Sequence, residues 1–220
     1  MPMSAQLTFN WKIEDSYLSD DFIVSKSNLN AVNFINELPQ KATSNGALLY
    51  GMLDSGKTHL SKIWLEKNDA SLIDKSQIGI LSSQEICQNN NIILLEDIET
   101  INNEEALFHL MRHIETQKLF LLITANCAAN QLNFKLPDLM SRLIALPSAI
   151  INSPDENLLQ IITTKWFSDR QLRVNNEIIN YIITRSERSF SSIRMIIEKI
   201  EKLSLETKRE ITIPLVKMVL

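Results

Sequence analysis

The chain has 220 residues, a mass of 25.2 kDa and ordinary proportions of hydrophobic (45%) and charged (22%) residues. A chain of this size buries roughly 70% of its unfolded surface, so it can form a core without disulfides or structural metals. No apolar run approaches the ~18 residues of a membrane-spanning helix, and the N-terminus lacks the pattern of a secretory signal. The two cysteines are too few for a disulfide framework, and we expect a cytoplasmic protein.

The formal net charge of −4 is unevenly distributed along the chain. Residues 161–220 contain eleven Lys and Arg against seven Asp and Glu, whereas residues 1–160 contain eleven against nineteen. Proteins that bind nucleic acid directly usually carry a basic surface, so the overall balance argues against direct sequence-specific DNA binding. The basic C-terminal part remains suited to an anionic ligand or partner.

Short apolar strands alternate with helices in the first two thirds of the chain. Fully apolar strands separated by helices predict an α/β fold, with a parallel sheet covered by helices on both faces. We expect strands at 47–50, 72–73, 92–95, 119–123 and 143–146, and helices at 28–38, 58–67, 103–115 (with Asn102 or Asn103 as N-cap) and from about Pro137 onward.

The remaining third of the chain shows only helical patterns. Ser153, Pro154 and Glu156 have the spacing of a helix N-cap, first helical residue and capping-box acid. Helices are expected at 154–168, 175–185, 190–204 and 213–220, and the resulting division is a flexible arm at 1–26, an α/β domain at 27–151 and a small all-helical domain at 152–220.

The segment GMLDSGKT, residues 51–58, matches the phosphate-binding pattern G-x-x-x-x-G-K-[ST]. It follows an expected strand and opens an expected helix, which is the context such a loop requires. Backbone N–H groups of the loop surround phosphates, the lysine reaches the β- and γ-phosphates, and the last hydroxyl binds Mg²⁺. We therefore expect an ADP or ATP site with Mg²⁺ at Gly51, Asp54, Ser55, Gly56, Lys57 and Thr58.

Polar residues follow two further apolar strands. Glu96 and Asp97 come after 92–95, and Asn126 comes close after 119–123. Two acids at a strand end are also typical of an exposed turn, and a terminal Asn is common. With a phosphate loop upstream, however, these positions favour Mg²⁺ binding by Glu96, water activation by Asp97 and phosphate sensing by Asn126.

The order of these elements resembles that of AAA+ ATPases, and several segments resemble the DnaA/Hda family, its Hda branch most closely. The similar segments are SGKTHL at 55–60, EEALFH at 104–109, LPDLMSRL at 136–143 and KREITIP at 208–214. The resemblance implies that the helical domain is the AAA+ lid, that Arg194 in it is a second nucleotide sensor, and that Arg142 is an arginine finger acting in trans on a neighbouring DnaA. Without the family, either arginine reads as a surface charge.

The tetrapeptide QLTF at 6–9 is similar to the peptide with which Hda proteins bind the DNA polymerase sliding clamp. Such a peptide supplies a glutamine and apolar side chains to a pocket, here Gln6, Leu7 and Phe9. The chain ends at Leu220, just after the expected lid, which favours an Hda-like regulator over a complete initiator with its DNA-binding domain. DnaA, the clamp and a further copy of the chain are the expected partners.

Two departures from the family argue for weak intrinsic hydrolysis. Asp54 stands where the family usually has glycine, and its charge should weaken phosphate binding, although Asp tolerates a left-handed backbone. The acidic pair also reads Glu-Asp rather than beginning with Asp. Two alternatives stay open, namely an ATP-hydrolysing loader or remodeller of a replication complex, and a clamp-bound scaffold with a vestigial nucleotide site.

Overall fold

A computed structural model describes residues 22–87 and 90–220 of the chain. Five parallel strands form one sheet in the order β2-β3-β4-β1-β5. The predicted α/β fold with a parallel sheet is therefore confirmed. The strands are β1 (Gly46–Tyr50), β2 (Ser71–Leu72), β3 (Ile92–Leu95), β4 (Phe120–Ala125) and β5 (Ser148–Ile150).

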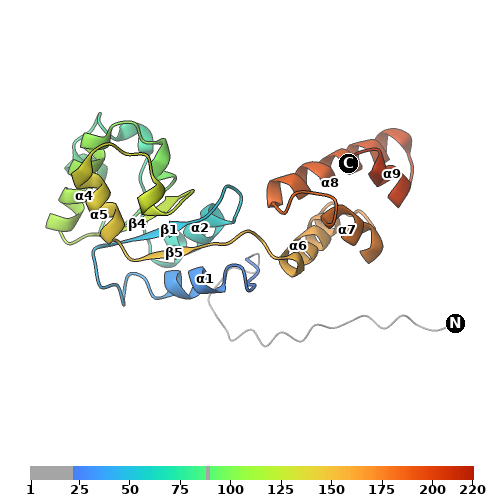
Figure 1. Cartoon of the computed structure of the whole chain (residues 1–220), viewed down its shortest axis with the longest axis horizontal. Helices are drawn as coiled ribbons and strands as arrows, with labels where there is room; N and C mark the ends of the chain where they lie inside the picture. The colour runs from blue at the N-terminus through green and yellow to red at the C-terminus, as the bar shows by residue number, and fades with distance from the viewer. Residues whose placement is uncertain (1–21, 88–89) are drawn as a thin grey trace.

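Helices cover both faces of the sheet, as its entirely apolar central strands require (Figure 1). Within β1, Leu48 belongs to the core on one face, while its neighbours Ala47 and Leu49 belong to the core on the other. The helices on the Ala47 face are α1 (Leu29–Asn36) and α2 (Lys57–Lys67), and those on the Leu48 face are α3 (Ser83–Cys87), α4 (Glu104–Thr116) and α5 (Pro137–Ala145). Asn103 caps α4 as predicted, because its side chain accepts a hydrogen bond from Ala106 N–H at 3.0 Å.

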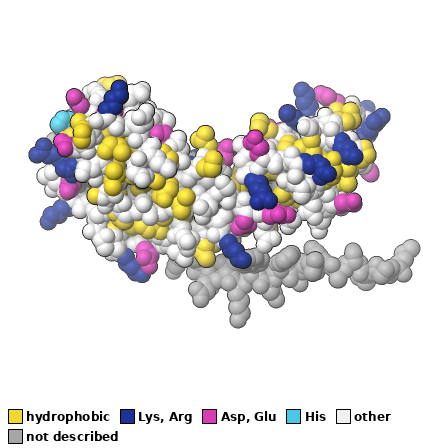
Figure 2. All heavy atoms as spheres, in the orientation of Figure 1, with side chains coloured by type: hydrophobic (Ala, Val, Ile, Leu, Met, Phe, Trp, Pro, Cys, Tyr) yellow, Lys and Arg dark blue, Asp and Glu magenta, His cyan; other side chains and the backbone are white. Residues whose placement is uncertain are grey.

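The C-terminal helices pack around a separate core built mainly from isoleucines, and they form their own lobe in Figure 1. Lysine and arginine side chains are spread over this lobe in Figure 2, in keeping with the basic sequence of residues 161–220. In the part of the chain that the structure describes, no helix has both the length and the hydrophobicity needed to span a bilayer. The helices are α6 (Glu156–Asp169), α7 (Asn176–Ile183), α8 (Phe190–Thr207) and α9 (Ile213–Lys217).

The last strand lies later than predicted. Residues 143–146 were expected to form it, but α5 continues to Ala145 and β5 follows at Ser148. Leu139 and Leu143, four residues apart, are the fully buried face of α5, while Ile144 is exposed. The apolar end of an amphipathic helix was therefore misread as a strand, and β5, a partly exposed edge strand, carries little apolar signal.

The predicted capping box at Ser153 is wrong. The N-cap of α6 is Asp155, whose Oδ1 accepts a hydrogen bond from Leu158 N–H at 2.9 Å. Its other oxygen, Oδ2, accepts one from the backbone N–H of Ser27 at 3.2 Å. The Asp155 carboxylate thus both caps α6 and binds the backbone of Ser27, which lies 128 positions earlier in the sequence. No local sequence pattern reveals this second contact.

Residues 22–26 were expected in the flexible arm, but they pack against the α/β domain. Phe22 and Val24 contact the core beneath α1 and α2. The side chain of Asn28 accepts a hydrogen bond from Ser25 N–H at 2.8 Å and donates one to Ile23 O at 3.0 Å. These local bonds fix the segment beside the phosphate loop. Gln6, Leu7 and Phe9 lie outside the described residues.

We expect Asp155→Ala to lower the free energy of unfolding by about 0.5–2 kcal/mol, as for loss of a helix N-cap. Burial by itself would raise the pKa of Asp155, but hydrogen bonds from Leu158 and from the 22–28 segment outweigh it and hold that pKa below its ordinary value. A carboxylate with a lowered pKa stabilises the fold above the unfolded pKa of about 3.9 and loses this effect as the pH falls through the folded pKa. Urea unfolding at pH 7 and at about pH 3 should therefore show a smaller difference between variant and parent at the lower pH.

Asp169→Ala is the matched control, because Asp169 is an exposed acid at the opposite end of the same helix. An acid at a helix C-terminus is not stabilising, so no loss is expected there. Equal stability losses in the two variants would contradict the capping role of Asp155.

Candidate functional site: a phosphate loop between two lobes

The phosphate loop, the acidic pair and Asn126 meet at one edge of the sheet. All strands are parallel, so the residues that follow β1, β3 and β4 emerge together at the carboxyl edge. Gly51 N–H donates a hydrogen bond to Ala125 O at 3.2 Å, which ties the start of the loop to the residue just before Asn126. The structure therefore places the loop, the acidic pair and Asn126 at one edge of the sheet, while the predicted second sensor Arg194 belongs to the helical lobe.

The loop has a shape that suits a phosphate. A Cβ at Gly51 would lie 2.4 Å from Ile151 O and 2.8 Å from Ser55 Oγ, so only glycine fits at this close approach. Gly56 has φ +97°, and Asp54 also adopts a left-handed conformation at φ 57°, as its residue type allows. The buried Ser55 hydroxyl has no hydrogen-bond partner among the described residues. A buried unpaired hydroxyl in a glycine-bounded loop fits the phosphate oxygens of a nucleotide.

Lys57, the loop lysine, is buried at the N-terminus of α2. Its Nζ donates to Gly51 O at 2.7 Å and to Met52 O at 3.0 Å, so the ammonium is held against the loop backbone. Burial lowers the pKa of Lys57, and nearby carboxylates, Asp97 first among them, oppose that shift. An ammonium at this position can exchange carbonyl oxygens for phosphate oxygens with little movement along the loop.

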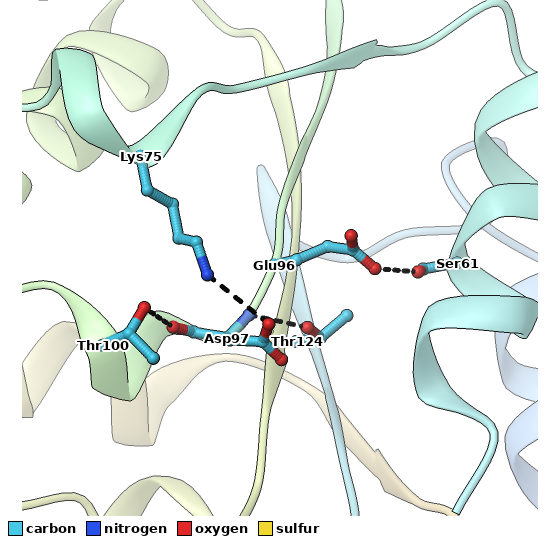
Figure 3. Close-up of polar contacts among 6 residues, drawn as sticks. All are labelled: Ser61, Lys75, Glu96, Asp97, Thr100 and Thr124. Carbon is cyan, nitrogen blue, oxygen red and sulfur yellow. Dashed lines mark hydrogen bonds and ion pairs between the residues drawn. The ribbon is translucent and has the colours of Figure 1, made fainter. Parts of the chain in front are cut away.

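The two acids after β3 extend in different directions (Figure 3). Glu96 reaches α2, where its Oε1 accepts a hydrogen bond from Ser61 Oγ at 2.7 Å, one turn beyond Thr58. The Glu96 carboxylate, held one helical turn from the exposed Thr58, could bind Mg²⁺ together with the Thr58 hydroxyl, because Mg²⁺ prefers a few protein oxygens together with phosphates and water.

Asp97 is directed elsewhere. Its carboxylate forms an ion pair of 3.4 Å with Lys75, on the side away from Ser61 (Figure 3). Its backbone has φ 48°, and its N–H donates to the buried hydroxyl of Thr124 in β4 at 2.9 Å. The predicted water-activating carboxylate is therefore engaged by a lysine, a pairing across 22 residues that the sequence did not indicate.

A small pocket of about 180 Å³ joins the loop to the helical lobe. Pockets for whole small-molecule ligands usually exceed about 300 Å³, so this one accounts for only part of a nucleotide site. It is lined by Met52, Leu53, Asp54 and Ser55 of the loop, by Ser153 and Pro154 of the connection, and by Glu187, Arg188 and Ser189 before α8.

The lobe faces this pocket with Arg188, not with Arg194. The guanidinium of Arg194, the predicted second sensor, lies over the ring of Trp166 at 5.1 Å from its centroid, and Arg194 does not line the pocket. Sequence reasoning passed over Arg188 because nothing marked it among six arginines of the basic C-terminal part. Its position just before Ser189, the N-cap of α8, is the signal that could have identified it.

Phe22 is a second residue near the loop that sequence reasoning missed. Its ring lies edge-on to that of His59 at 5.2 Å, and its edge comes within 3.9 Å of the Cβ position at Gly56. Phe22 therefore places an apolar ring beside the phosphate loop.

Arg142 lies at the other end of the sheet. Its side chain, 35% exposed, forms an ion pair with Glu115 of α4, and its guanidinium lies 5.4 Å from the centroid of the Phe108 ring. It borders a pocket of about 310 Å³ that also includes Gly46, the first residue of β1. The phosphate loop follows the last residue of β1, roughly 13 Å further along the strand. Arg142 therefore lies on the domain surface, away from the chain's own phosphate loop.

Comparisons with known proteins find similarity to Hda and DnaA. Residues 155–220 match the family model described as "Hda, lid domain". A protein of Haemophilus influenzae, described as uncharacterized, is 31% identical over 185 residues, covering 78% of this chain and 80% of that protein. The chromosomal replication initiator protein DnaA of Buchnera aphidicola subsp. Cinara cedri is 26% identical over 98% of this chain, which spans only 55% of that initiator.

Solved structures of DnaA share the fold. Domain III of the Thermotoga maritima replication initiation protein DnaA superposes with a TM-score of 0.76 at 20% identity, covering 93% of this chain and 95% of that structure. AMPPCP-bound DnaA from Aquifex aeolicus gives 0.70 at 16% identity, covering 89% and 68%. The lid match over residues 155–220, the sequence similarity to DnaA and the DnaA-like fold together show that the chain belongs to the DnaA/Hda family of AAA+ proteins, as an Hda-like member.

Proposed function

We propose that this chain is a regulator of chromosome replication initiation that stimulates hydrolysis of DnaA-bound ATP through Arg142 in trans. The observation that carries the proposal is the position of Arg142, partly exposed and at the opposite sheet edge from the chain's own phosphate loop. An arginine so placed is unable to serve its own nucleotide but is available to that of a neighbouring subunit. A planar, permanently charged fork suits γ-phosphate oxygens that gain charge in the transition state.

The chain's own nucleotide, ADP or ATP, would occupy the loop between the two lobes. Lys57 and the loop N–H groups would hold its phosphates, and the unpaired Ser55 hydroxyl would donate to them. Thr58 and Glu96 would hold Mg²⁺, which neutralises phosphate charge when bound. Asn126 would sense the terminal phosphate, since it directly follows Ala125, whose carbonyl accepts the hydrogen bond from Gly51 N–H at the start of the loop. The AMPPCP-bound structure of a relative with the same fold supports an adenine nucleotide.

Intrinsic hydrolysis would be weak. Asp54 places a negative charge in the loop beside the phosphates, and Asp97 is paired with Lys75 rather than free to orient water. The site then serves to hold nucleotide and stabilise the arrangement of the two lobes, while the arginine acts on the partner's ATP.

We expect Arg188, rather than Arg194, to be the lobe's contribution to nucleotide binding. Arg188→Ala should weaken ADP affinity by about tenfold or more, the value of a charge-assisted hydrogen bond to phosphate. Arg194→Ala, which removes the guanidinium over Trp166, should change it less than about threefold. Isothermal titration with ADP and Mg²⁺ measures both. The reverse ranking would restore Arg194 as the sensor.

The N-terminal QLTF peptide would dock the chain on the sliding clamp through Gln6, Leu7 and Phe9. We expect Gln6→Ala combined with Leu7→Ala to abolish clamp binding, because the peptide would supply both its polar and its apolar contacts. Surface plasmon resonance with immobilised clamp tests this, and an unchanged thermal midpoint shows that the fold is intact. Unchanged clamp affinity in the double variant would exclude the peptide.

The decisive assay follows the nucleotide bound to DnaA, with and without this chain and DNA-loaded clamp. Accelerated conversion of bound ATP to ADP supports the proposal. Robust turnover by the isolated chain would instead indicate a loader or remodeller, and clamp binding without nucleotide binding would indicate a scaffold. The proposal implies DnaA and the sliding clamp as partners and a cytoplasmic location. Self-association of the chain is also allowed by it. Sequence-specific DNA binding by this chain is not expected.

A further inference from the structure

We propose that Glu115 is a latch that holds Arg142 in a resting position and competes for it with the partner's phosphates. This inference rests on the proposed function, because it concerns how the arginine is released for use in trans. Two groups hold the guanidinium, namely the carboxylate of Glu115 and the ring of Phe108, and both come from α4.

Glu115 has no role in stabilising its own helix. It is the penultimate residue of α4 (Glu104–Thr116), and the backbone carbonyl groups at this C-terminal end of the helix carry a partial negative charge. A carboxylate there is unfavourable unless a cation offsets it, and Arg142 of α5 is that cation. The position therefore serves the contact between the two helices rather than α4 itself.

The ion pair between Glu115 and Arg142 can separate at little cost because both side chains reach solvent. The Glu115 side chain is 59% exposed and that of Arg142 35%, so water can replace each partner as the pair separates. The adjoining pocket of about 310 Å³ is lined by the polar residues Ser44 and Asn45 as well as by apolar side chains such as Met111, and it leaves the guanidinium room to turn. By contrast, the phosphate-loop lysine Lys57 is buried and held by two backbone carbonyls.

The ion pair between Glu115 and Arg142 is expected to be weak, and its loss is expected to change activity only modestly. Exposed ion pairs are modest, so breaking this one should change apparent activity by about two- to fivefold and not by orders of magnitude. Removing the carboxylate therefore favours release of Arg142 from its resting position.

The test compares Glu115→Gln with Glu105→Gln, an exposed acid on the same helix. DnaA-bound ATP hydrolysis is measured at a subsaturating concentration of each protein with DNA-loaded clamp. We expect Glu115→Gln to raise stimulation about two- to fivefold, with the gain shrinking at higher salt, and Glu105→Gln to match the parent. A loss of stimulation in Glu115→Gln would mean that the acid positions the arginine productively, and would overturn the latch, as would no change.

Two further measurements separate the latch from the proposed function. Phenylglyoxal modification of Arg142, followed by mass spectrometry without any partner, should be faster in Glu115→Gln than in the parent and in Glu105→Gln. Combining Glu115→Gln with Arg142→Ala should remove all gain. Normal stimulation by Arg142→Ala alone would refute the proposed function and the latch with it. Loss of stimulation in Arg142→Ala, with equal modification rates and no gain in Glu115→Gln, would refute only the latch.

Discussion

Arg142→Ala is expected to lower the stimulated hydrolysis of DnaA-bound ATP by about 10³- to 10⁵-fold, the range by which arginine fingers accelerate phosphoryl transfer. The side chain lies at the sheet edge remote from its own phosphate loop, so folding, clamp binding and ADP affinity of the chain should stay nearly unchanged. Single-turnover conversion of DnaA-bound ATP measures the loss. Unfolding and ADP titrations establish that the variant is otherwise intact.

Arg142→Lys and Arg112→Ala are the controls for this result. Lysine keeps the charge but lacks the planar fork that binds two phosphate oxygens together, so it should rescue poorly. Arg112 is an exposed arginine on the neighbouring helix α4, and its loss should leave stimulation intact. If Arg142 is only a surface charge paired with Glu115, its loss costs at most about 1 kcal/mol of stability and stimulation stays within a few-fold of the parent. That outcome would favour the scaffold alternative.

Lys57→Ala is expected to weaken ADP binding by about 10- to 100-fold, because a charge-assisted hydrogen bond to phosphate contributes roughly 1.5–3 kcal/mol. The lysine is the cation at the start of α2, and its Nζ already lies against the loop carbonyls of Gly51 and Met52. Calorimetric titration with ADP and Mg²⁺ measures the change. The variant also leaves these two carbonyls without that donor, so its thermal midpoint is recorded alongside.

Lys62→Ala is the matched control, since Lys62 is an exposed lysine on the same helix. It removes an equal charge from α2 and should leave ADP affinity within about twofold. Equal ADP affinity in Lys57→Ala and the parent would remove the phosphate-loop assignment. An equal loss of ADP affinity in both lysine variants would mean that the effect comes from the overall positive charge of α2 and not from a specific contact of Lys57.

Features that depend on a local residue pattern could be predicted from the sequence alone. The glycine spacing of residues 51–58, the fully apolar strands and the Asn103 cap each reside in a few consecutive residues, and each physical requirement can be read where it occurs. Because parallel strands end at a common edge, these local elements also implied that Glu96 and Asn126, which follow β3 and β4, lie at the same edge of the sheet as the loop that follows β1. The family followed from short segments in the same way.

Pairs of side chains that are far apart in the sequence could be identified only from the folded structure. Asp155 rather than Ser153 caps α6, and its second carboxylate oxygen accepts a hydrogen bond from Ser27 N–H, while Asp97 pairs with Lys75. The position of Arg188 at the loop and the contact of Glu115 with Arg142 likewise depend on how whole helices pack. When a side chain has two candidate partners, the geometry and desolvation in the folded state determine which pair forms. The neighbouring residues in the sequence do not reveal either of these.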